Sequence, residues 1–460
     1  MTFPLAAQQP NAVTGVSSTL SIRTRVEGWN WFGVAAGDDY VYGHLLLRAG
    51  LMQQRERFGW RLEFAAPIVV GAPSDATQGH GASYYRSNGQ RRTVAALFPR
   101  QAFVTLGRAA DGHRLKLGRF EFSEGGETSP ANPTLAAVKR RSVVQRLIGP
   151  FNFTQGARSL DGVEYGWSRR GLNVTLLGAV PTVGVFNLDG WNSVPELPVG
   201  YAALTGPGPW SRERSEWRVF AAGFADRRAL MKADNRALVA READREPIEI
   251  ATVGGHLLHV VPTIAGPVDF AVWTAVQFGA WGAQSHRAGA MDLEIGWQPR
   301  DVCWRPWLRV GVFASSGDAD PSDGRHGTFF QKMATPRLFA RFPFYNLMNV
   351  RDWQASVTLR PRGRLTLRGD LRVLQLGNVA DGWYFGSGPF DTETFGLGIR
   401  PSTGARALGT LADLSADFEV SRHWSLTAYA SRAIAGAVIQ ASTPRATPGS
   451  FAFLEVEYRR

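Results

Sequence analysis

Residues 353–373 read WQASVTLRPRGRLTLRGDLRV, and this stretch decides the fold class. Odd-numbered positions such as Trp353, Leu365 and Leu371 are apolar or small, whereas the even-numbered positions between them are polar or charged. Successive side chains of a β-strand point to opposite faces, so the alternation predicts two strands, each with one apolar and one polar face. The Pro-Arg-Gly connector at 361–363 is short enough to predict a tight hairpin.

The same unit recurs along the chain, as in 413–420 and 424–430 around the connector Ser421-Arg422-His423. Short connectors of this kind separate alternating or mostly apolar segments at 53–57, 108–113, 169–171, 206–211, 261–267, 299–303, 361–363 and 421–423. Between them lie other connectors, most of them long and rich in Gly, Pro, Asp or Arg, at 32–39, 67–92, 123–158, 181–197, 226–247, 282–287, 316–350, 377–409 and 435–450.

Eight short turns and nine other connectors predict eighteen strands. Short connections on one rim and long ones on the other are typical of antiparallel outer-membrane β-barrels, whose short turns face the periplasm. The count treats 394–400 as a hairpin inside a loop rather than as a spanning strand. We therefore expect a periplasmic N-terminal segment at 1–18 and a single transmembrane β-barrel domain at 19–460, in the bacterial outer membrane.

Two other architectures fit the sequence less well. The longest charge-free runs, 171–188 and 270–285, are broken by Gly, Pro or Asn and do not resemble a helix of about 20 apolar residues. A soluble two-sheet or propeller protein would not explain the asymmetry of the connectors. Tryptophans also gather near predicted strand ends, where aromatic girdles of barrels lie: Trp29, Trp31, Trp60, Trp167, Trp297, Trp304, Trp307 and Trp353.

Composition and motifs exclude several function classes. The single cysteine, Cys303, allows neither an intrachain disulfide nor a cysteine-based metal cluster. The chain has no Gly-x-Ser-x-Gly elbow, phosphate loop, His-Glu-x-x-His or dinucleotide fingerprint, so we expect no enzyme and no cofactor. Basic residues scattered over alternating strands also argue against a nucleic-acid partner.

The chain resembles the alginate-export outer-membrane family, whose members are eighteen-stranded barrels that export an anionic polysaccharide. The most specific resemblance lies in Leu117–Glu121, Gln145–Phe151 and Arg158–Val163, where Leu160 replaces the family's usual Phe. Further likeness lies in 316–318, 323–329 and 408–418. The resemblance implies an alginate-like substrate, contact with the bilayer and lipopolysaccharide, and periplasmic export partners.

If the apolar side chains of each strand contact lipid, the polar side chains that alternate with them line the lumen. These inward positions include ten arginines that we predict to line the pore and contact substrate: Arg23, Arg25, Arg48, Arg61, Arg218, Arg309, Arg360, Arg364, Arg368 and Arg372. A guanidinium matches a carboxylate in charge and shape, so inward arginines favour anionic solutes, as does the net charge of +12.

The same phase also carries acidic residues, so the lumen is mixed rather than simply basic: Glu27, Glu63, Glu164, Glu216, Asp292, Glu294, Asp370, Asp413, Asp417, Glu419, Glu455 and Glu457. Strand neighbours predict cross-strand ion pairs, with Arg23 and Arg25 against Glu455 and Glu457. Each arginine therefore has a structural interpretation beside the substrate-binding one, and a few unpaired arginines would form the selective ring.

Two motif residues fall outside this scheme. Arg119 and Asp161 have the lipid-facing phase, so they must lie beyond the apolar band or follow a β-bulge, which Gly118 and Gly162 would permit. We predict a structural ion pair of Arg119 or Arg158 with Asp161 at the rim, in preference to a substrate contact.

Three connectors allow further predictions. The basic segment 135–148, with Lys139, Arg140, Arg141 and Arg146, fits a solvated or lipopolysaccharide-binding loop better than an inward constriction. Residues 226–246 mix charges at helical spacings and predict an external helix. A weak calcium site is compatible with Asp318, Asp320 and Asp323, although their spacing differs from that of an EF-hand.

Three functions remain open on the sequence. The barrel exports or passes an anionic polysaccharide, it is a general or anion-preferring porin for small solutes, or it is a closed scaffold for a partner protein. The first rests chiefly on the family resemblance, whereas the barrel itself rests on the alternation.

Overall fold

The computed structural model describes residues 15–107, 112–333, 335, 341–443 and 445–460. The N-terminal segment 1–18 lies almost entirely outside these ranges, and the first wall strand begins at Ser17. Within the described ranges, no helix has both the length and the apolar character needed to cross a membrane.

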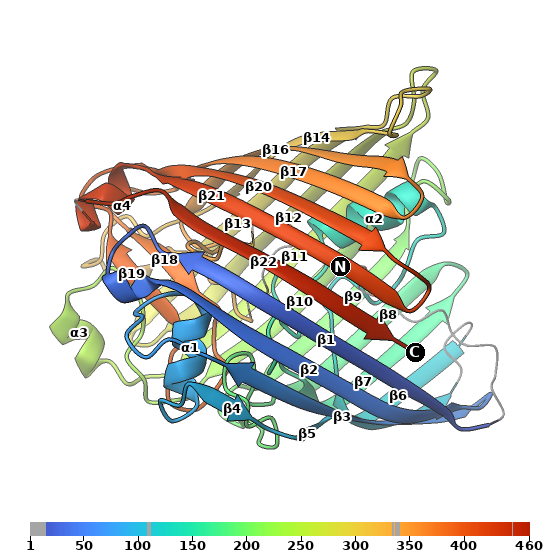
Figure 1. Cartoon of the computed structure of the whole chain (residues 1–460), viewed down its shortest axis with the longest axis horizontal. Coiled ribbons are helices and arrows are strands. Elements are labelled where there is room, and N and C mark those ends of the chain that lie inside the picture. Colours follow the sequence, from blue (N-terminus) through green and yellow to red (C-terminus); the bar gives the residue numbers. More distant parts are fainter. Residues whose placement is uncertain (1–14, 108–111, 334, 336–340, 444) are drawn as a thin grey trace.

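Eighteen antiparallel strands form one closed sheet in the described chain (Figure 1), as predicted. Nine of them are β1 (Ser17–Asn30), β2 (Asp39–Gln54), β3 (Phe58–Val70), β5 (Phe98–Gly107), β6 (Gly112–Phe120), β7 (Leu160–Arg169), β8 (Leu172–Pro181), β9 (Val199–Pro207) and β10 (Ser215–Asp226). The others are β11 (Ile248–Val261), β12 (Val268–Trp281), β13 (Gln284–Trp297), β14 (Trp307–Ser315), β16 (Val350–Arg362), β17 (Leu365–Leu376), β20 (Ala407–Glu419), β21 (Trp424–Ala435) and β22 (Gly449–Arg459).

Pairing of β1 with β22 closes the sheet, and it aligns Arg23 with Glu457 and Arg25 with Glu455, as the alternation predicted. Each of the eight predicted short connectors joins neighbouring wall strands at one end of the barrel. The end with the short turns is the periplasmic end of an outer-membrane barrel.

The opposite end carries the longer connectors and the remaining elements: η1 (Ala36–Asp38), α1 (Gly79–Ser87), β4 (Thr93–Ala95), α3 (Leu238–Ala243), β15 (Arg325–His326), β18 (Gly382–Gly386), β19 (Leu397–Pro401) and α4 (Ala437–Ser442). α3 is the external helix expected in 226–246. β18 and β19 pair only with each other, which confirms that 394–400 belongs to a hairpin within a loop. The exception among these connectors is the two-residue turn between β12 and β13.

The polarity of the wall is inverted relative to a soluble protein. Outward side chains such as Val276, Leu414 and Leu454 are exposed by 54%, 68% and 54%. Inward charged residues such as Arg25 and Asp352 are almost fully buried. An apolar outer face and a polar inner face are what lipid contact and a filled lumen require.

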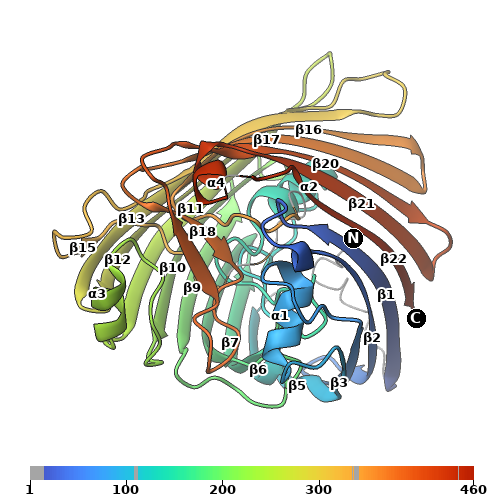
Figure 2. The same ribbon diagram turned by 60° about the vertical axis from the view of Figure 1, so that its left-hand side comes forward.

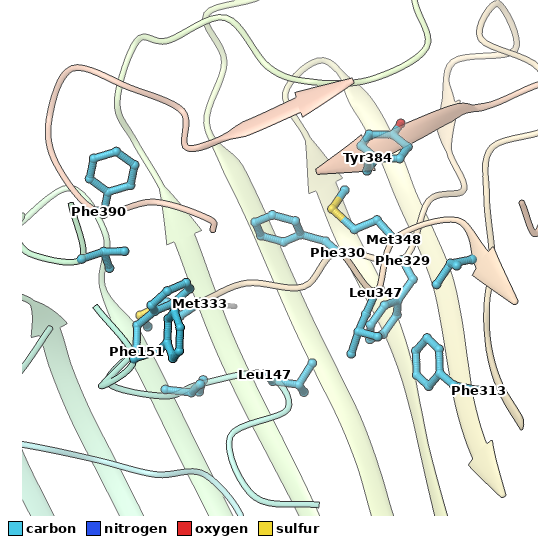
Figure 3. Close-up of a cluster of buried hydrophobic side chains, with 14 of the residues drawn as sticks. Leu147, Phe151, Phe313, Phe329, Phe330, Met333, Leu347, Met348, Tyr384 and Phe390 are labelled. Carbon is cyan, nitrogen blue, oxygen red and sulfur yellow. The ribbon is translucent and has the colours of Figure 1, made fainter. Parts of the chain in front are cut away.

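The interior holds a packed apolar core built by the connectors. Phe151, Phe329, Phe330 and Tyr384 come from three different connectors and pack together inside the barrel, close to Phe313 of β14 (Figure 3). Figure 2 shows α1 and β18 lying inside the ring of strands at the end with the long loops. The lumen at this end is therefore occupied by protein.

The tryptophans contradict part of the girdle interpretation. Trp29, Trp31 and Trp307 are only 3%, 4% and 6% exposed and point into the barrel. Trp297, Trp304 and Trp353 are 40%, 55% and 54% exposed, as a girdle residue should be. Position near a strand end does not by itself tell on which face a tryptophan lies.

Candidate channel interior

The connector 121–159 folds into the lumen, where it forms α2 (Pro133–Ser142) near the periplasmic end (Figure 1). The helix begins where the Asn132 side chain accepts a hydrogen bond from the Leu135 N–H at 3.0 Å, followed by Pro133 in the first turn. Both are good helix-start residues. The expectation of a solvated or lipopolysaccharide-binding loop for 135–148 is therefore wrong.

Ion pairs with the wall explain the inward fold of α2. Lys139 has no exposed surface and lies 2.8 Å from Glu216 on β10. Arg141 lies 3.2 Å from Asp370 on β17, and Arg146 pairs with Asp292 on β13. Because a buried charge is tolerated only when it is paired, inward carboxylates of the wall hold the basic segment in place.

Four of the predicted pore arginines hold the same inward segment. Arg23 donates to the Asn152 carbonyl at 2.7 Å, and Arg25 donates to the Phe153 carbonyl at 3.0 Å. Arg218 lies 2.9 Å from Glu124 and 3.0 Å from Glu127. Arg48 contacts Glu121 at 2.8 Å, where the segment begins. These arginines are anchors of 121–159 rather than a lining open to solute.

Four others pair with carboxylates of the wall. The pairs are Arg61 with Glu63, Arg309 with Glu294 and Asp269, Arg372 with Asp352 and Asp370, and Arg368 with Asp417. The cross-strand interpretation of the inward charges holds for Arg309, Arg368 and Arg372, whereas Arg61 pairs with a carboxylate two residues along its own strand. A buried pair of this kind fixes the geometry of the wall and leaves little charge for a solute.

Arg360 and Arg364 are exposed on the lumen side near the periplasmic end. Arg364 donates to the Val420 carbonyl at 3.3 Å. Arg360 lies within electrostatic range of Arg140, Arg305 and Arg368. Among the described residues, neither Arg140 nor Arg360 has a side-chain hydrogen bond or an ion pair. We call Arg140, Arg360 and Arg305 the basic mouth.

Half-burial and then the charge of Arg368 lower the pKa of Arg140 from its ordinary value. Arg140 reaches this position because its neighbours Lys139 and Arg141 are tied to the wall. The sequence singled out Arg140 but favoured the wrong location for it.

The motif residues Arg119 and Asp161 form the predicted ion pair at the rim with the long loops. Two hydrogen bonds of 2.7 Å join the guanidinium to both carboxylate oxygens. Pairing of β6 with β7 runs through Gly118 and Gly162 without a register shift, so both residues lie beyond the apolar band rather than after a bulge. Arg158 is elsewhere: it is buried and donates to the Pro389 and Ser387 carbonyls at 3.0 and 3.3 Å.

The three aspartates proposed for calcium do not converge. Asp318 accepts from the Gly327 N–H, Asp320 from Ser322 and Asp323 from the Arg325 N–H. Across the part of the chain that the structure describes, no group of three acidic, His or Cys residues could hold a metal ion. Amides and hydroxyls of the same loop bind Asp320 and Asp323 and one oxygen of Asp318.

Arg100 and Lys332 are two of the interior cations that sequence reasoning missed. Arg100 on β5 is 3% exposed and donates to Glu121 at 2.9 Å and to Asn152 at 2.8 Å. Lys332, in the connector 316–349, is fully buried and donates to Thr252, and burial lowers its pKa to about 7. The inward phase of β5 could have indicated Arg100, whereas nothing in the sequence of 316–349 marks Lys332 as buried.

The sequence model of a family described as alginate export matches residues 144–453. The chain belongs to the alginate export family. No curated protein shows significant similarity to this family member. Its barrel is similar to solved structures of Pseudomonas aeruginosa OccK9 (OpdG), with a TM-score of 0.61, 11% identity and coverage of 97% of this chain and 99% of that chain.

Two further solved structures show the same likeness. Acinetobacter baumannii OccAB2 has a TM-score of 0.59, 10% identity and coverage of 98% of both chains. Pseudomonas aeruginosa OccK2 (OpdF), solved in complex with glucuronate, has a TM-score of 0.55, 11% identity and coverage of 96% of both chains. Family and barrel place this alginate export protein in the bacterial outer membrane as a porin-like channel in contact with lipid.

Proposed function

We propose that this barrel passes an anionic polysaccharide, alginate-like in its carboxylates, and that the basic mouth is where the polymer enters from the periplasmic side. The observation that carries the proposal is the pair Arg140 and Arg360. Elsewhere in the lumen the predicted arginines are mostly neutralised by carboxylates or bound to carbonyls. Here the half-buried Arg140 and the exposed Arg360 lie within electrostatic range of each other, and neither has an acidic partner among the described residues.

Neighbouring positive charges at an opening raise the local concentration of anions, and a partly buried charge such as that of Arg140 is less screened than one on an open surface. A guanidinium also presents a planar fork that matches a carboxylate. The protein's role in this proposal is transport without a catalytic step, and export partners would dock at the short-turn rim.

Blockade by oligouronates in planar bilayers tests the proposal. An oligouronate added on the periplasmic side should interrupt the current of the wild-type channel, with interruptions that lengthen as the chain lengthens. A neutral oligosaccharide of equal length should not interrupt it. The double variant Arg140→Gln/Arg360→Gln should shorten the interruptions about thirtyfold or more, since each of the two lost charged contacts contributes about 1 kcal/mol or more.

Arg57→Gln is the matched control, because Arg57 is an exposed arginine in the turn between β2 and β3 at the same rim. Its interruptions should match those of the wild type. Equal blockade by neutral and acidic oligosaccharides would contradict the proposal. Absence of any conductance would also contradict it and would favour the scaffold function.

A second candidate is a porin for small acidic solutes. The packed connectors favour it, since they occupy the lumen at the long-loop end and leave a cavity of about 430 Å³ there. The similar barrel OccK2 (OpdF) was solved in complex with glucuronate, a small acidic sugar, which supports this candidate. Interruptions that do not depend on chain length, together with uptake of monomeric uronates into liposomes, would support it over the first.

A further inference from the structure

A short strand of the connector 316–349 is attached to the wall at the extracellular end of the barrel. β15 pairs in parallel with the first residues of β13, and His326 lies opposite His286 (Figure 2). Just beyond β15, the same connector places the almost fully buried Phe329 and Phe330 in the lumen (Figure 3). The contact at β15 therefore helps to hold a segment that fills the outer end of the barrel. We call residues 323–330 the latched segment.

The two histidine rings meet head to head. His286 Nδ1 and His326 Nδ1 are 2.9 Å apart. The ring centroids are 5.1 Å apart and the ring planes differ by 28°, so the two nitrogens lie between the rings. Both side chains are buried, with exposed fractions of 3% and 1%. At this separation one nitrogen must carry a hydrogen and the other must offer a lone pair.

Gln277 on β12 decides which nitrogen carries the hydrogen. Its Oε1 accepts from the Phe330 N–H at 2.8 Å and its Nε2 donates to the Phe330 carbonyl at 2.8 Å, which fixes the orientation of the amide. The same Oε1 lies 3.3 Å from His286 Nε2, so this nitrogen donates. Neutral His286 therefore has a bare Nδ1, and His326 Nδ1 is the donor. His326 Nε2 is then bare, and the described structure gives it no hydrogen-bond partner.

Either ring can take up a proton only at the expense of this contact. A proton on His286 Nδ1 would face the N–H of His326 across 2.9 Å, although the nearby His326 carbonyl offsets part of that repulsion. A proton on His326 Nε2 would be a buried donor without an acceptor, which costs free energy. The Trp281 ring, stacked on His326 at 4.1 Å, attracts a charged imidazole but lies over its face and does not accept this N–H.

The charged groups around the pair also oppose a proton. Lys332, in the same connector, lies within electrostatic range of His286, and Arg236, in the connector between β10 and β11, lies within range of His326. Asp234 accepts from the stacked tryptophan at 2.9 Å and is already paired with Arg236 at 2.8 Å. In the part of the chain that the structure describes, neither ring forms an ion pair with a carboxylate. Burial, and then the neighbouring charges, hold the pKa of His326 well below its usual range.

We propose that His286 and His326 form an acid-sensitive latch, which holds the latched segment in the lumen at neutral pH and releases it when the rings take up protons. In the released segment the rings meet water and regain an ordinary pKa of about 6.5. Because the held state binds protons less well, its stability is complete above about pH 6.5 and falls as the pH falls below that value. Release opens the extracellular end of the channel, whichever solute the channel passes.

One carboxyl group acts against the latch as the pH falls. Asp381 accepts from the Asp318 N–H at 2.9 Å and from the Thr328 hydroxyl at 2.6 Å, and so ties the same connector to the connector 377–406. Burial raises the pKa of Asp381 to about 6, so its contribution to the held state grows as the pH falls below about 6. At pH 5 this group favours the held state about tenfold, whereas each histidine favours release by up to about thirtyfold.

Hydrogen exchange of the amides of Gly327, Phe329 and Phe330 tests the latch, since all three donate hydrogen bonds in the held state. Exchange is expressed as protection factors, which remove the intrinsic dependence of the exchange rate on pH. From pH 7.5 to pH 5, protection in the wild type should fall by up to about a hundredfold, because two histidines outweigh one carboxyl. His326→Asn keeps an N–H near the position of Nδ1 but takes up no proton, so up to about thirtyfold of that fall should disappear.

His44→Gln is the matched control. His44 is also a buried histidine of the wall, 4% exposed, but it lies on β2 and contacts Glu27 through Nε2 at 3.0 Å. Glutamine keeps an N–H near that position, and protection of the latched segment should depend on pH as it does in the wild type. Unchanged electrophoretic heat-modifiability shows that each variant keeps a folded barrel. Protection that does not fall in the wild type, or that falls equally in His326→Asn, would overturn the latch.

Single-channel conductance is the second measurement. Acidifying only the extracellular compartment from pH 7.5 to pH 5 should raise the conductance of the wild type more than that of His326→Asn, because release opens that end of the lumen. Equal responses of the two proteins would overturn the opening of the channel by this latch. Blockade by oligouronates through Arg140 and Arg360 is measured at pH 7.5, so failure of the latch and failure of the transport proposal are distinguishable.

Discussion

Replacing Arg218 by Met should release part of the inward segment 121–159. Arg218 is 1% exposed and holds the buried carboxylates of Glu124 and Glu127 at 2.9 and 3.0 Å. Methionine fills a similar space but leaves both carboxylates without their cation. Loss of one partner of a buried ion pair costs about 3–5 kcal/mol, which shifts the equilibrium between bound and released segment by roughly 10² to 5 × 10³.

Burial raises the pKa of Glu124 above its ordinary value even with Arg218 present, so its charged form depends on this partner. The triple variant Arg218→Met/Glu124→Gln/Glu127→Gln removes the uncompensated charges along with the cation. It should recover most of the lost stability, because a neutral buried cluster can replace an ion pair at little cost.

Hydrogen exchange of amides in 121–159 and single-channel conductance are the two assays. Arg218→Met should exchange faster in this segment by the factor given above and should conduct more current, whereas exchange in the wall strands should stay slow. The triple variant should resemble the wild type. Wild-type exchange and conductance in Arg218→Met would refute the view that wall arginines anchor the segment.

Three further predictions concern other parts of the barrel. The folded state lowers the pKa of Lys332 to about 7, so stability should rise by about 2 kcal/mol from about pH 7 to about pH 9, because over that range the unfolded chain keeps a proton that the folded chain has lost. Lys332→Met should abolish that rise in thermal unfolding, and a persisting rise would contradict the assignment. Leu414→Arg should destabilise the membrane-inserted barrel by about 2–4 kcal/mol in urea titrations, whereas Leu414→Ala should have a smaller effect, because the lipid face excludes charge. Arg119→Gln should cost about 1–3 kcal/mol, and the exchange Arg119→Asp/Asp161→Arg should restore part of it if the rim pair contributes as its geometry indicates.

The alternation of apolar and polar residues predicted the wall well, because each inward or outward position follows directly from the pleat of a strand. It predicted the closure in which Arg25 meets Glu455. It could not tell that 121–159 folds inward, since a connector has no fixed face and its charges suit water as well as a polar lumen. The register leaves Arg218 opposite Thr205 on one side and His256 on the other, neither of them acidic. The inward carboxylate two residues away, Glu216, is taken by Lys139 of the inward segment.

The candidate site could be predicted only in part for the same reason, because the sequence does not show where a connector folds. The alternation identified the inward arginines of the wall but not all of their partners, because Arg23, Arg48 and Arg218 each also bind groups in the connector 121–159. Arg140 became a candidate for the selective charge only when the ion pairs of Lys139 and Arg141 fixed the orientation of α2.

Channel function with a preference for anions is tested most directly by the zero-current potential of the wild-type barrel in a planar bilayer under a KCl gradient. The uncompensated Arg140 and Arg360 predict a potential with the sign of preferential chloride passage, and Arg140→Gln/Arg360→Gln should move it toward zero. A potential with the sign of preferential potassium passage, or one unchanged in the double variant, would contradict a basic mouth that selects anions.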